Sequence, residues 1–498
     1  MSRAKEQLYP DYSAFVAEIR EKGITVELLK KIIQRHRKNA LYNRKLYDRY
    51  MAVKGGTPID ERVPRYNEGK PINNKINNAF MAEIVDFKTG YFVGKPIGYG
   101  YSKGDEAEET TGGIEAVDVA TKAITDFVVR NNMYGVDMET VKFASIYGYA
   151  GRLFYIDTEG NERVMPVHGY ETIILSETDI SEPEYAIRYF DTTNIDGNKR
   201  WTVEFYDNVN IHTYEGGTLS SLEEKEKPKP HMFDYCPLQG VANNKELLGD
   251  AEKVLALIDD YDKILSDNSN EIEAFVHALM VTNIPGEKNE VEDTLQRANE
   301  SGILNIPPVG TFDMTNPVKW VTKNIDGTFT ENHLDRVEDN IYRFSNTPNL
   351  NDESFGSASG VSLKFKLHGL ETKCGINQAQ FMNAAMFMWK LLSASWAKRR
   401  IVVDPLQVTM SFERNFPLDT LAEAQAAQAM IAAGVPEEVA WDICISEIDD
   451  IDYVKELKEQ ETDITSMYED ITPQNNENTP TGNEFLGVQA NDREMIGK

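Results

Sequence analysis

The sequence predicts an α+β fold in which helical segments lie before and after a β-rich region. The chain of 498 residues, 41% of them apolar, is long enough to bury several cores. Apolar and polar side chains alternate from about residue 142 to residue 237, and Glu-Gly, Asp-Gly and Gly-Gly turns interrupt the alternation, which predicts antiparallel β-ribbons. Outside this region apolar residues recur at steps of three and four, which predicts helices.

The composition excludes several classes of protein. The formal net charge of -29 disfavours tight binding to phosphate backbones, because such binding relies on Lys and Arg displacing counterions. Cys236, Cys374 and Cys444 lie far apart with no CxxC pair, which argues against a disulfide framework or a zinc site. The first residues lack the apolar core of a signal peptide, and no run reaches the roughly 18 uncharged apolar residues of a membrane span. We therefore expect a protein of cytosolic origin without a membrane segment.

The amino-terminal part is basic and helical. Residues 1–55 contain thirteen Lys or Arg and six acids, and Val26–Met51 consists mostly of long helix-forming side chains. Such a helix either binds nucleic acid or presents a solvated face matched to acidic neighbours, and we favour the second interpretation. After a loop at residues 55–71 we expect a helix that ends near Gly90 and a short strand near Pro96. Residues 105–118 hold six acids and no base, which is typical of a mobile surface loop.

A long acidic helix is predicted after the β-rich region, from Asn243 to Leu279. Nine acids and two lysines occur between residues 246 and 273. The apolar positions repeat at alternating steps of four and three and are interrupted only at Asn268, so they keep one stripe facing a neighbouring helix. The members of this stripe that we expect to pack in the helix pair are Val254, Ile258, Tyr261 and Leu265.

A second helix is predicted to return along the first. A small αβ insert at about residues 279–327 separates the two, and residues 331–344 then carry apolar side chains at helical spacing. We expect Leu334, Val337 and Ile341 to pack against the first helix. The next residues, 345–360, are dense in Asn, Ser and Gly and are predicted to be a mobile loop.

The carboxy-terminal third is predicted to be mainly helical. Residues 361–367 alternate apolar and polar side chains, which by periodicity alone predicts a strand. A long helix rich in Met, Ala, Phe and Trp is expected over residues 376–398, followed by a strand. Two further helices are expected on either side of Gly434-Val435-Pro436, and the polar residues from about Asp463 are predicted to be disordered.

Several motifs that suggest chemistry fail on inspection. The segment at residues 194–197 resembles part of a calcium loop, but Val203 stands where a bidentate Glu is required, so we predict a hairpin turn. A Gly-x-x-x-Gly segment at residues 356–360 has Ala358 at the centre, where a hydrolase elbow needs serine. Two carboxylate clusters could in principle hold metals for a nuclease, but both lie on amphipathic helices without histidine, so solvated faces are favoured. They are Asp259, Asp260 and Asp262, and Glu447, Asp449, Asp450 and Asp452.

Four segments give the chain a family resemblance over most of residues 70–460. They are NNKINNAFMAEIVDFKTGYFVGKPIGY, SIYGYAGRLFYIDTEG, NNKELLGDAEKVLALIDDYDKILSDNSNEIEAF and GSASGVSLKFKLHGLE. In this order they resemble the SPP1-type portal proteins of tailed double-stranded DNA bacteriophages. The resemblance implies a ring-forming portal fold and makes residues 361–367 helical, against the alternation, and we adopt the helix.

The resemblance also implies how the portal fold is divided along this chain. Its parts are a wing of helices and β-ribbons (1–236), an outgoing stem helix (237–278), a small αβ clip (279–329), a returning stem helix (330–344), a tunnel loop (345–360), a long kinked helix with a return to the wing (361–420), a helical crown (421–463) and a disordered tail (464–498).

The function implied by the resemblance is a structural channel and not an enzyme. Portal rings, usually dodecamers in virions, occupy one capsid vertex; DNA passes through them during packaging and ejection, and they dock terminase, capsid or scaffold proteins and the head-tail adaptor. We therefore expect a virion protein that assembles in the host cytoplasm, without a cofactor. The alternatives are an acidic scaffold of the capsid interior and, less favoured, the metal-dependent nuclease.

In such a ring the negative charge is expected to affect how DNA moves through the channel. Twelve copies of a -29 chain carry about -350, so we expect much of the inner wall to repel phosphate and let DNA slide. The groups expected to lie nearest the duplex are Asn349, Asn351, Asp352, Ser357, Lys364 and Lys366. The competing interpretation of the two lysines is that they form salt bridges with acids of adjacent subunits.

Overall fold

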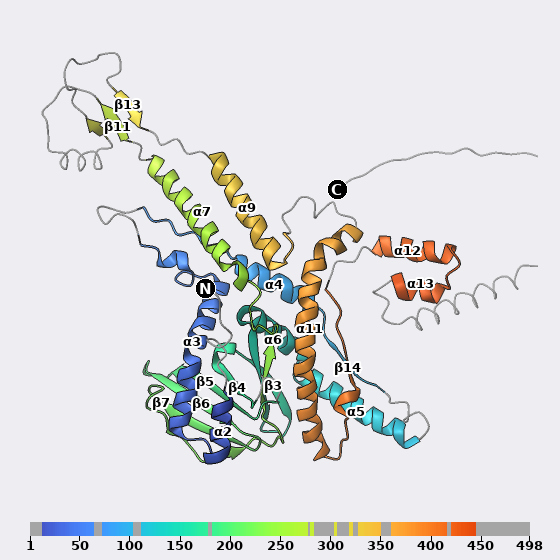
Figure 1. Cartoon of the computed structure of the whole chain (residues 1–498). Coiled ribbons are helices and arrows are strands. Elements are labelled where there is room, and N and C mark those ends of the chain that lie inside the picture. Colours follow the sequence, from blue (N-terminus) through green and yellow to red (C-terminus); the bar gives the residue numbers. More distant parts are fainter. Residues whose placement is uncertain are drawn as a thin grey trace, which may run out of the picture. The chain divides into compact units, whose positions relative to one another are not determined.

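The computed structural model describes residues 12–63, 72–102, 111–177, 182–276, 279–282, 303–305, 318–321, 327–349, 360–415 and 420–444. It confirms a mixed α+β fold and divides the chain into two compact units, Met1–Phe416 and Pro417–Lys498. The helices of the first unit are α2 (Ser13–Lys22), α3 (Val26–Met51), α4 (Phe80–Val93), α5 (Thr111–Arg130), α6 (Met133–Tyr147), α7 (Leu255–Val276), α9 (Gly327–Ser345) and α11 (Gly360–Ala397) (Figure 1). No helix in these ranges is both long and apolar enough to cross a bilayer.

The predicted β-ribbons are present as two antiparallel sheets, but they begin at Tyr149 and not at residue 142, because residues 142–147 belong to the helix α6. The larger sheet contains, in order, β4 (Thr172–Leu175), β5 (Tyr185–Thr193), β6 (Lys199–Tyr206), β7 (Asn210–Gly216) and β8 (Glu223–Glu224), with β9 (Lys229–Pro230) also on β7. The smaller sheet has the order β10 (Leu238–Ala242), β2 (Tyr149–Ile156), β3 (Glu162–Val167). The hairpin prediction for residues 194–197 is confirmed, because Gly197, at a φ of 80°, lies in the turn between β5 and β6.

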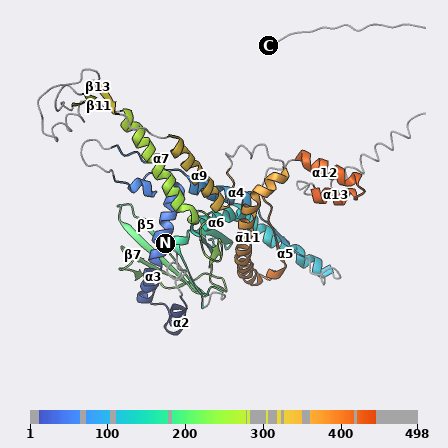
Figure 2. The same cartoon turned by 45° about the horizontal axis from the view of Figure 1, so that its top comes forward.

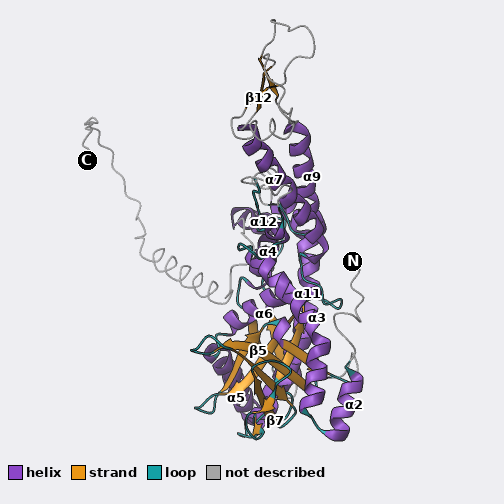
Figure 3. Ribbon diagram, turned by 90° about the vertical axis from the view of Figure 1, so that its left-hand side faces the viewer, coloured by secondary structure: helices purple, strands orange, loops and turns teal. Residues whose placement is uncertain are grey.

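The basic helix α3 covers the larger sheet. Thr25 caps its first turn by accepting a hydrogen bond from the Leu28 backbone N–H at 3.2 Å. Its buried face contributes Leu29, Ile32 and Ile33 to a core that it shares with β4, β5, β6 and β7. Figure 3 shows α2 and α3 along one side of the sheets. The helix is therefore fixed by its apolar face, and most of its cations point away from the core.

The longest helix, α11, organises the main core. Its residues Phe381, Met388 and Trp389 are fully buried and pack with α4, α5 and β14 (Val408–Ser411), which pairs with β1 (Gly98–Tyr101). Residues 361–367 belong to this helix, so the family-based expectation is confirmed and the strand indicated by alternation is wrong. The reason is that the buried positions continue at helical steps from Leu367 to Leu370. Figures 1 and 2 show the first turns of α11 bent away from the rest.

The loop prediction for residues 105–118 is wrong in part. Residues 105–110 lie outside the described residues, but α5 begins at Thr111 and continues to Arg130. Its buried side chains Ala120, Ile124 and Phe127 follow a helical period and face the α11 core. The acids and the Gly-Gly pair at its start concealed this pattern. The helix α4 ends at Val93 and not near Gly90.

The start of the long acidic helix is also corrected. Residues 243–251 do not form a regular helix; a 3-10 turn at Glu252–Val254 leads into α7, which begins at Leu255. The backbone N–H groups of Asn243 and Asp250 donate to the carbonyls of Gly148 and Ser145, at 3.0 and 2.7 Å. These long-range bonds replace the helical ones. A side chain at Gly148 would also clash with the Leu247 carbonyl.

The insert between α7 and α9 contains a three-stranded sheet. Its strands are β11 (Leu279–Thr282), β12 (Ile303–Asn305) and β13 (Val318–Val321), with β12 parallel and β13 antiparallel to β11. The predicted returning helix is confirmed as α9. Figures 1 and 2 both show α7 and α9 side by side.

The second unit contains two described helices. They are α12 (Thr420–Ala432) and α13 (Glu437–Cys444), and Gly434 lies between them at a φ of 92°. This confirms the two helices predicted on either side of residues 434–436. The second carboxylate cluster (447–452), the end of the predicted crown and the predicted disordered tail lie outside the described residues.

Candidate functional site: the paired stem helices

The paired helices α7 and α9 share an apolar seam. Of the residues expected to pack there, Val254, Ile258, Leu334, Val337 and Ile341 are buried, whereas Tyr261 and Leu265 are half-buried. The helix α4 lies against the same seam through Phe80, whose ring meets Tyr261 edge-on with centroids 5.0 Å apart. The α7–α9 pair therefore joins α4 in a three-helix junction and is not an isolated hairpin.

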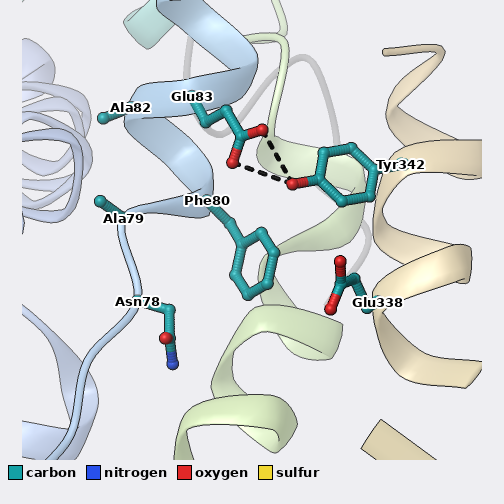
Figure 4. A pocket seen from close by; sticks show the side chains of 7 residues that line it. All are labelled: Asn78, Ala79, Phe80, Ala82, Glu83, Glu338 and Tyr342. Carbon is teal, nitrogen blue, oxygen red and sulfur yellow. Dashed lines mark hydrogen bonds between the residues drawn. The ribbon is translucent and has the colours of Figure 1, made fainter. Parts of the chain in front are cut away.

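A small acidic pocket opens beside this junction. It has a volume of about 350 Å³ and is lined by Asn78, Ala79, Phe80, Ala82, Glu83, Glu338 and Tyr342 (Figure 4). The Tyr342 hydroxyl lies 2.9 Å from both Glu83 carboxylate oxygens. Burial and this hydrogen bond raise the pKa of Tyr342, so the phenol stays protonated and ties α9 to α4.

An extended segment, residues 72–79, binds the polar side of α7. The Asn78 backbone N–H donates to Asp262 Oδ1 at 3.0 Å, the Ile76 N–H to Ser266 Oγ at 3.0 Å, and the Asn74 N–H to Asn270 Oδ1 at 2.6 Å. The acceptors recur every four residues of helix and the donors every two residues of extended chain. Four helical residues rise about 6.0 Å and two extended residues about 6.6 Å, so the two spacings match.

The acids of α7 are largely used within the chain. Asp259 accepts hydrogen bonds from both terminal nitrogens of Arg49 at 2.8 Å, and Asp267 forms an ion pair with Arg62. Asp260 lies 3.5 Å from His333, and Asp262 accepts from Asn78. Burial raises the pKa of Asp262 despite these bonds. Since the first carboxylate cluster serves three separate partners, it does not converge on one point, and the described residues contain no group of three or more potential metal ligands.

A buried charge cluster lies where the chain enters α7 and leaves α9. The Lys88 ammonium is fully buried and lies 2.8 Å from Ser145 Oγ, 2.9 Å from Asn243 Oδ1, 3.1 Å from Asn377 Oδ1 and 3.3 Å from Asp250 Oδ2. Burial alone would raise the pKa of Asp250, but the charges of Lys373 and Lys88 and the hydrogen bond from Asn243 outweigh it and lower the pKa to about 2. Asp250 is therefore ionised between two lysines.

The second lysine of this cluster connects α11 with α9. Lys373 Nζ lies 3.2 Å from Asp250 Oδ1 and donates to the Ser345 carbonyl at 2.9 Å. Ser345 is the last residue of α9, where the partial negative charge of the helix dipole favours a cation. The segment that leads into α7, the end of α9 and the long helix α11 thus meet at the ion pair between Lys373 and Asp250.

The residues expected to lie near DNA are only partly described. Asn349 is half-buried and its amide donates to Glu338 at 3.1 Å, and Lys366 is half-buried on α11. Asn351, Asp352, Ser357 and the side chain of Lys364 lie outside the described residues.

Sequence reasoning missed both the Lys88 cluster and the 72–79 segment. The paired asparagines of NNKINNAF, residues 73–80, could have indicated the contact with a helix. Their side chains and backbone N–H groups form hydrogen bonds with the polar side chains of α7.

Comparisons with known proteins agree with this architecture. The sequence matches the family described as "Phage portal protein, SPP1 Gp6-like" over residues 29–466. It is 21% identical over 452 residues to a protein named "Portal protein" from Clostridium phage phiCD119, covering 86% of this chain and 94% of that protein. It is 22% identical over 393 residues to the "Portal protein" of Bacillus phage SPP1, covering 75% of this chain and 73% of the relative. Because the family match extends over most of its length, the chain belongs to the SPP1 Gp6-like family of phage portal proteins.

Proposed function

We propose that this chain forms the ring-shaped DNA channel at a unique vertex of a phage capsid, through which the genome is packaged, retained and ejected. The observation that carries the proposal is the antiparallel pair α7 and α9, with a small sheet between them in sequence, in a chain of the portal family. In this proposal α7 and α9 form the stem of the ring. The ring assembles in the host cytoplasm and is retained in the virion.

The structural parts are assigned to this function as follows. The wing is 1–236, the clip 279–329, the returning stem 330–344, the tunnel loop 345–360, the kinked helix and wing return 361–420, the crown 421–463 and the tail 464–498. The outgoing stem, 237–278, keeps its place in this division, but its regular helix begins only at Leu255.

The partners follow from the proposed place in the capsid. They are further copies of this chain, with twelve as the proposed number, double-stranded DNA, terminase, capsid or scaffold proteins and the head-tail adaptor. ATP cleavage is assigned to the separate terminase, and this chain acts without a cofactor of its own.

The proposed DNA contacts are the tunnel-loop groups Asn349, Asn351, Asp352 and Ser357 together with Lys364 and Lys366. Their test is packaging by rings that carry Lys364→Ala and Lys366→Ala. We expect these rings to assemble normally but to package or retain DNA less well. Normal packaging and retention would contradict the contact and favour salt bridges between subunits.

Negative-stain microscopy with rotational averaging tests the function itself. We expect closed rings with an open centre. Solid or irregular particles would instead support the acidic capsid-interior scaffold, and metal-dependent cleavage of DNA by the purified chain would support the nuclease. The pairing of Asp259, Asp260 and Asp262 with three different partners argues against that last alternative.

A further inference from the structure

The exposed side of α3 is a concentrated patch of positive charge in an acidic protein. Residues 26–51 contain eight Lys or Arg and two acids, a net +6, which leaves -35 for the rest of the -29 chain. We define the basic face of α3 as its exposed residues Lys31, Arg35, Arg37, Lys38 and Lys45. Within the described part of the chain, none of these five has an ion pair within 4.0 Å, whereas the nearby Arg44 lies 3.8 Å from Asp191.

The basic face is unfavourable for the helix on its own. Lys31 and Arg35 are four residues apart, and Arg35 and Lys38 three apart, so each pair places like charges side by side on the surface. The buried side of α3 compensates through its packing on the sheet. An external acidic surface would remove the repulsion and convert it into attraction, which points to a docking face.

The apolar residues around these cations indicate a protein partner. Leu41 lies in the middle of the exposed side of α3 and is 56% exposed, and beyond the helix Val53 is also 56% exposed. Phosphate groups offer nothing to such side chains, whereas protein interfaces combine an apolar centre with a charged rim. A second copy of the chain offers complementary charge, because the rest of the chain carries a net -35.

We propose that the basic face of α3 binds an acidic surface on the next copy of this chain in the ring. The inference rests on the proposed ring and adds which face makes the contact. In a head-to-tail ring, each subunit presents one face to the different face of its neighbour, so a basic patch meets an acidic one without any residue opposing itself. Complementary charge of this kind also speeds the encounter of subunits.

Carbodiimide cross-linking of assembled rings tests the contact directly, because it joins a lysine amine to a carboxylate that touches it. Rings are assembled from a mixture of ¹⁵N-labelled and unlabelled full-length chain, so that mass spectrometry separates contacts between copies from those within one copy. We expect cross-links between copies at Lys31, Lys38 or Lys45. Rings that give such cross-links only at other lysines overturn the proposal.

Charge reversal provides the second test. The variant Lys31→Glu, Arg35→Glu and Lys38→Glu is compared with a control that carries the same charge change at other exposed lysines, Lys122→Glu, Lys227→Glu and Lys245→Glu. Circular dichroism and thermal melting establish that both variants are folded. We expect the α3 variant to need about tenfold or more protein for half-assembly, measured by sedimentation velocity, while the control assembles like the natural chain.

The remaining outcomes separate this contact from the ring itself. If the α3 variant assembles as well as the control, the contact is wrong and the ring stands. If it assembles normally but loses binding to a fluorescent 30-base-pair duplex, the face serves nucleic acid and the proposal is overturned. If the natural chain does not assemble at any concentration, the proposed ring fails, and this contact fails with it.

Discussion

The buried charge cluster of Lys88, Asp250 and Lys373 gives the sharpest prediction for stability. Asp250→Asn keeps the size of the side chain but removes the carboxylate that neutralises Lys88 and Lys373. Two ammonium groups would then face each other, with Lys88 fully buried. Removing one partner of a buried ion pair costs about 3–5 kcal/mol, because the remaining charge is left in a medium of low polarity. We expect the free energy of unfolding to fall by this amount.

The assay is urea unfolding of the full chain at pH 7, followed by tryptophan fluorescence. Trp389 and Trp396 are suitable probes because both are buried in the α11 core. A loss of 3–5 kcal/mol corresponds to a fall of roughly 3–6 °C in the melting temperature, because the unit Met1–Phe416 gains about 2.1 cal/mol/K per residue on unfolding. The matched control is Asp260→Asn, whose exposed carboxylate lies 3.5 Å from His333, and we expect a change within about 0.5 kcal/mol.

A double-mutant cycle tests whether Asp250→Asn lowers stability because it leaves the charges of Lys88 and Lys373 without a counter-ion. Lys373→Met removes one of the two lysines, so adding it to Asp250→Asn relieves part of the repulsion. We expect the double variant to be more stable than the sum of the two single changes by about 1–3 kcal/mol. An Asp250→Asn chain within about 1 kcal/mol of the natural one, or strict additivity in the cycle, would refute this reasoning.

Acid titration gives an independent measure of the same group. The folded pKa of Asp250 is about 2, below its ordinary value of 3.8, so its contribution to stability is complete above pH 4. It is lost as the pH falls from about 4 to 2, because the unfolded chain binds the proton first. We expect a loss of about 2 kcal/mol over this range in the natural chain. The slope should be smaller in Asp250→Asn, and equal slopes would contradict the assignment.

Three further predictions concern other parts of the fold. Ile341→Ala should cost about 2–5 kcal/mol in urea unfolding because Ile341 is fully buried in the stem seam, whereas Phe344→Ala, at a residue 53% exposed, should cost much less; equal costs would contradict the seam. Asp262→Ala leaves the Asn78 N–H without its acceptor, so amide exchange at residues 74–78 should accelerate while Asp260→Ala leaves it unchanged. Burial lowers the pKa of His36 to about 4 from 6.5, so stability should fall as the pH falls through this interval, and His36→Gln should flatten that dependence when melting is followed against pH.

The returning stem helix and the hairpins could be predicted because their signals are local. The apolar spacing of α9 and the glycine turns of the larger sheet need only neighbouring residues to take effect. The start of α7 could not be predicted in this way. The apolar spacing continues back to Leu247, but the backbone N–H groups of Asn243 and Asp250 donate to carbonyls about a hundred residues earlier in the chain. Tertiary hydrogen bonds therefore overrode helix propensity.

The roles of Lys88 and of residues 72–79 could not be predicted from the sequence for a related reason. Lys88 lies in the middle of α4, and a lysine in a helix normally marks a solvated position. Its burial is possible because Asp250 and Asn377, from two distant segments, supply a counter-ion and a hydrogen-bond acceptor. The same applies to residues 72–79, whose polar sequence indicates a loop until α7 provides a ladder of acceptors at the matching distance.

The acids of α7 are less available to an external partner than the sequence suggests. Asp259, Asp262 and Asp267 bind residues of the same chain and are at most partly exposed. Among the α7 side chains that the structure describes, the exposed ones are Ala256, Lys263, Ile272 and Glu273. Glu273 is the one acid among them, and it accepts a hydrogen bond from the Asn74 amide at 2.7 Å.

The returning helix is different in this respect. It exposes an acid every four residues, at Glu331, Asp335 and Asp339, and none of the three has an ion pair within 4.0 Å in the described part of the chain. Adjacent members of this series repel one another on the helix surface, and the repulsion is tolerated because the opposite side of α9 is anchored by Leu334, Val337 and Ile341. If the proposed ring repels phosphate, this row of acids on α9 is a better source of the field than the paired Asp259 and Asp267 of α7, although the exposed Arg336 and Arg343 of α9 reduce it.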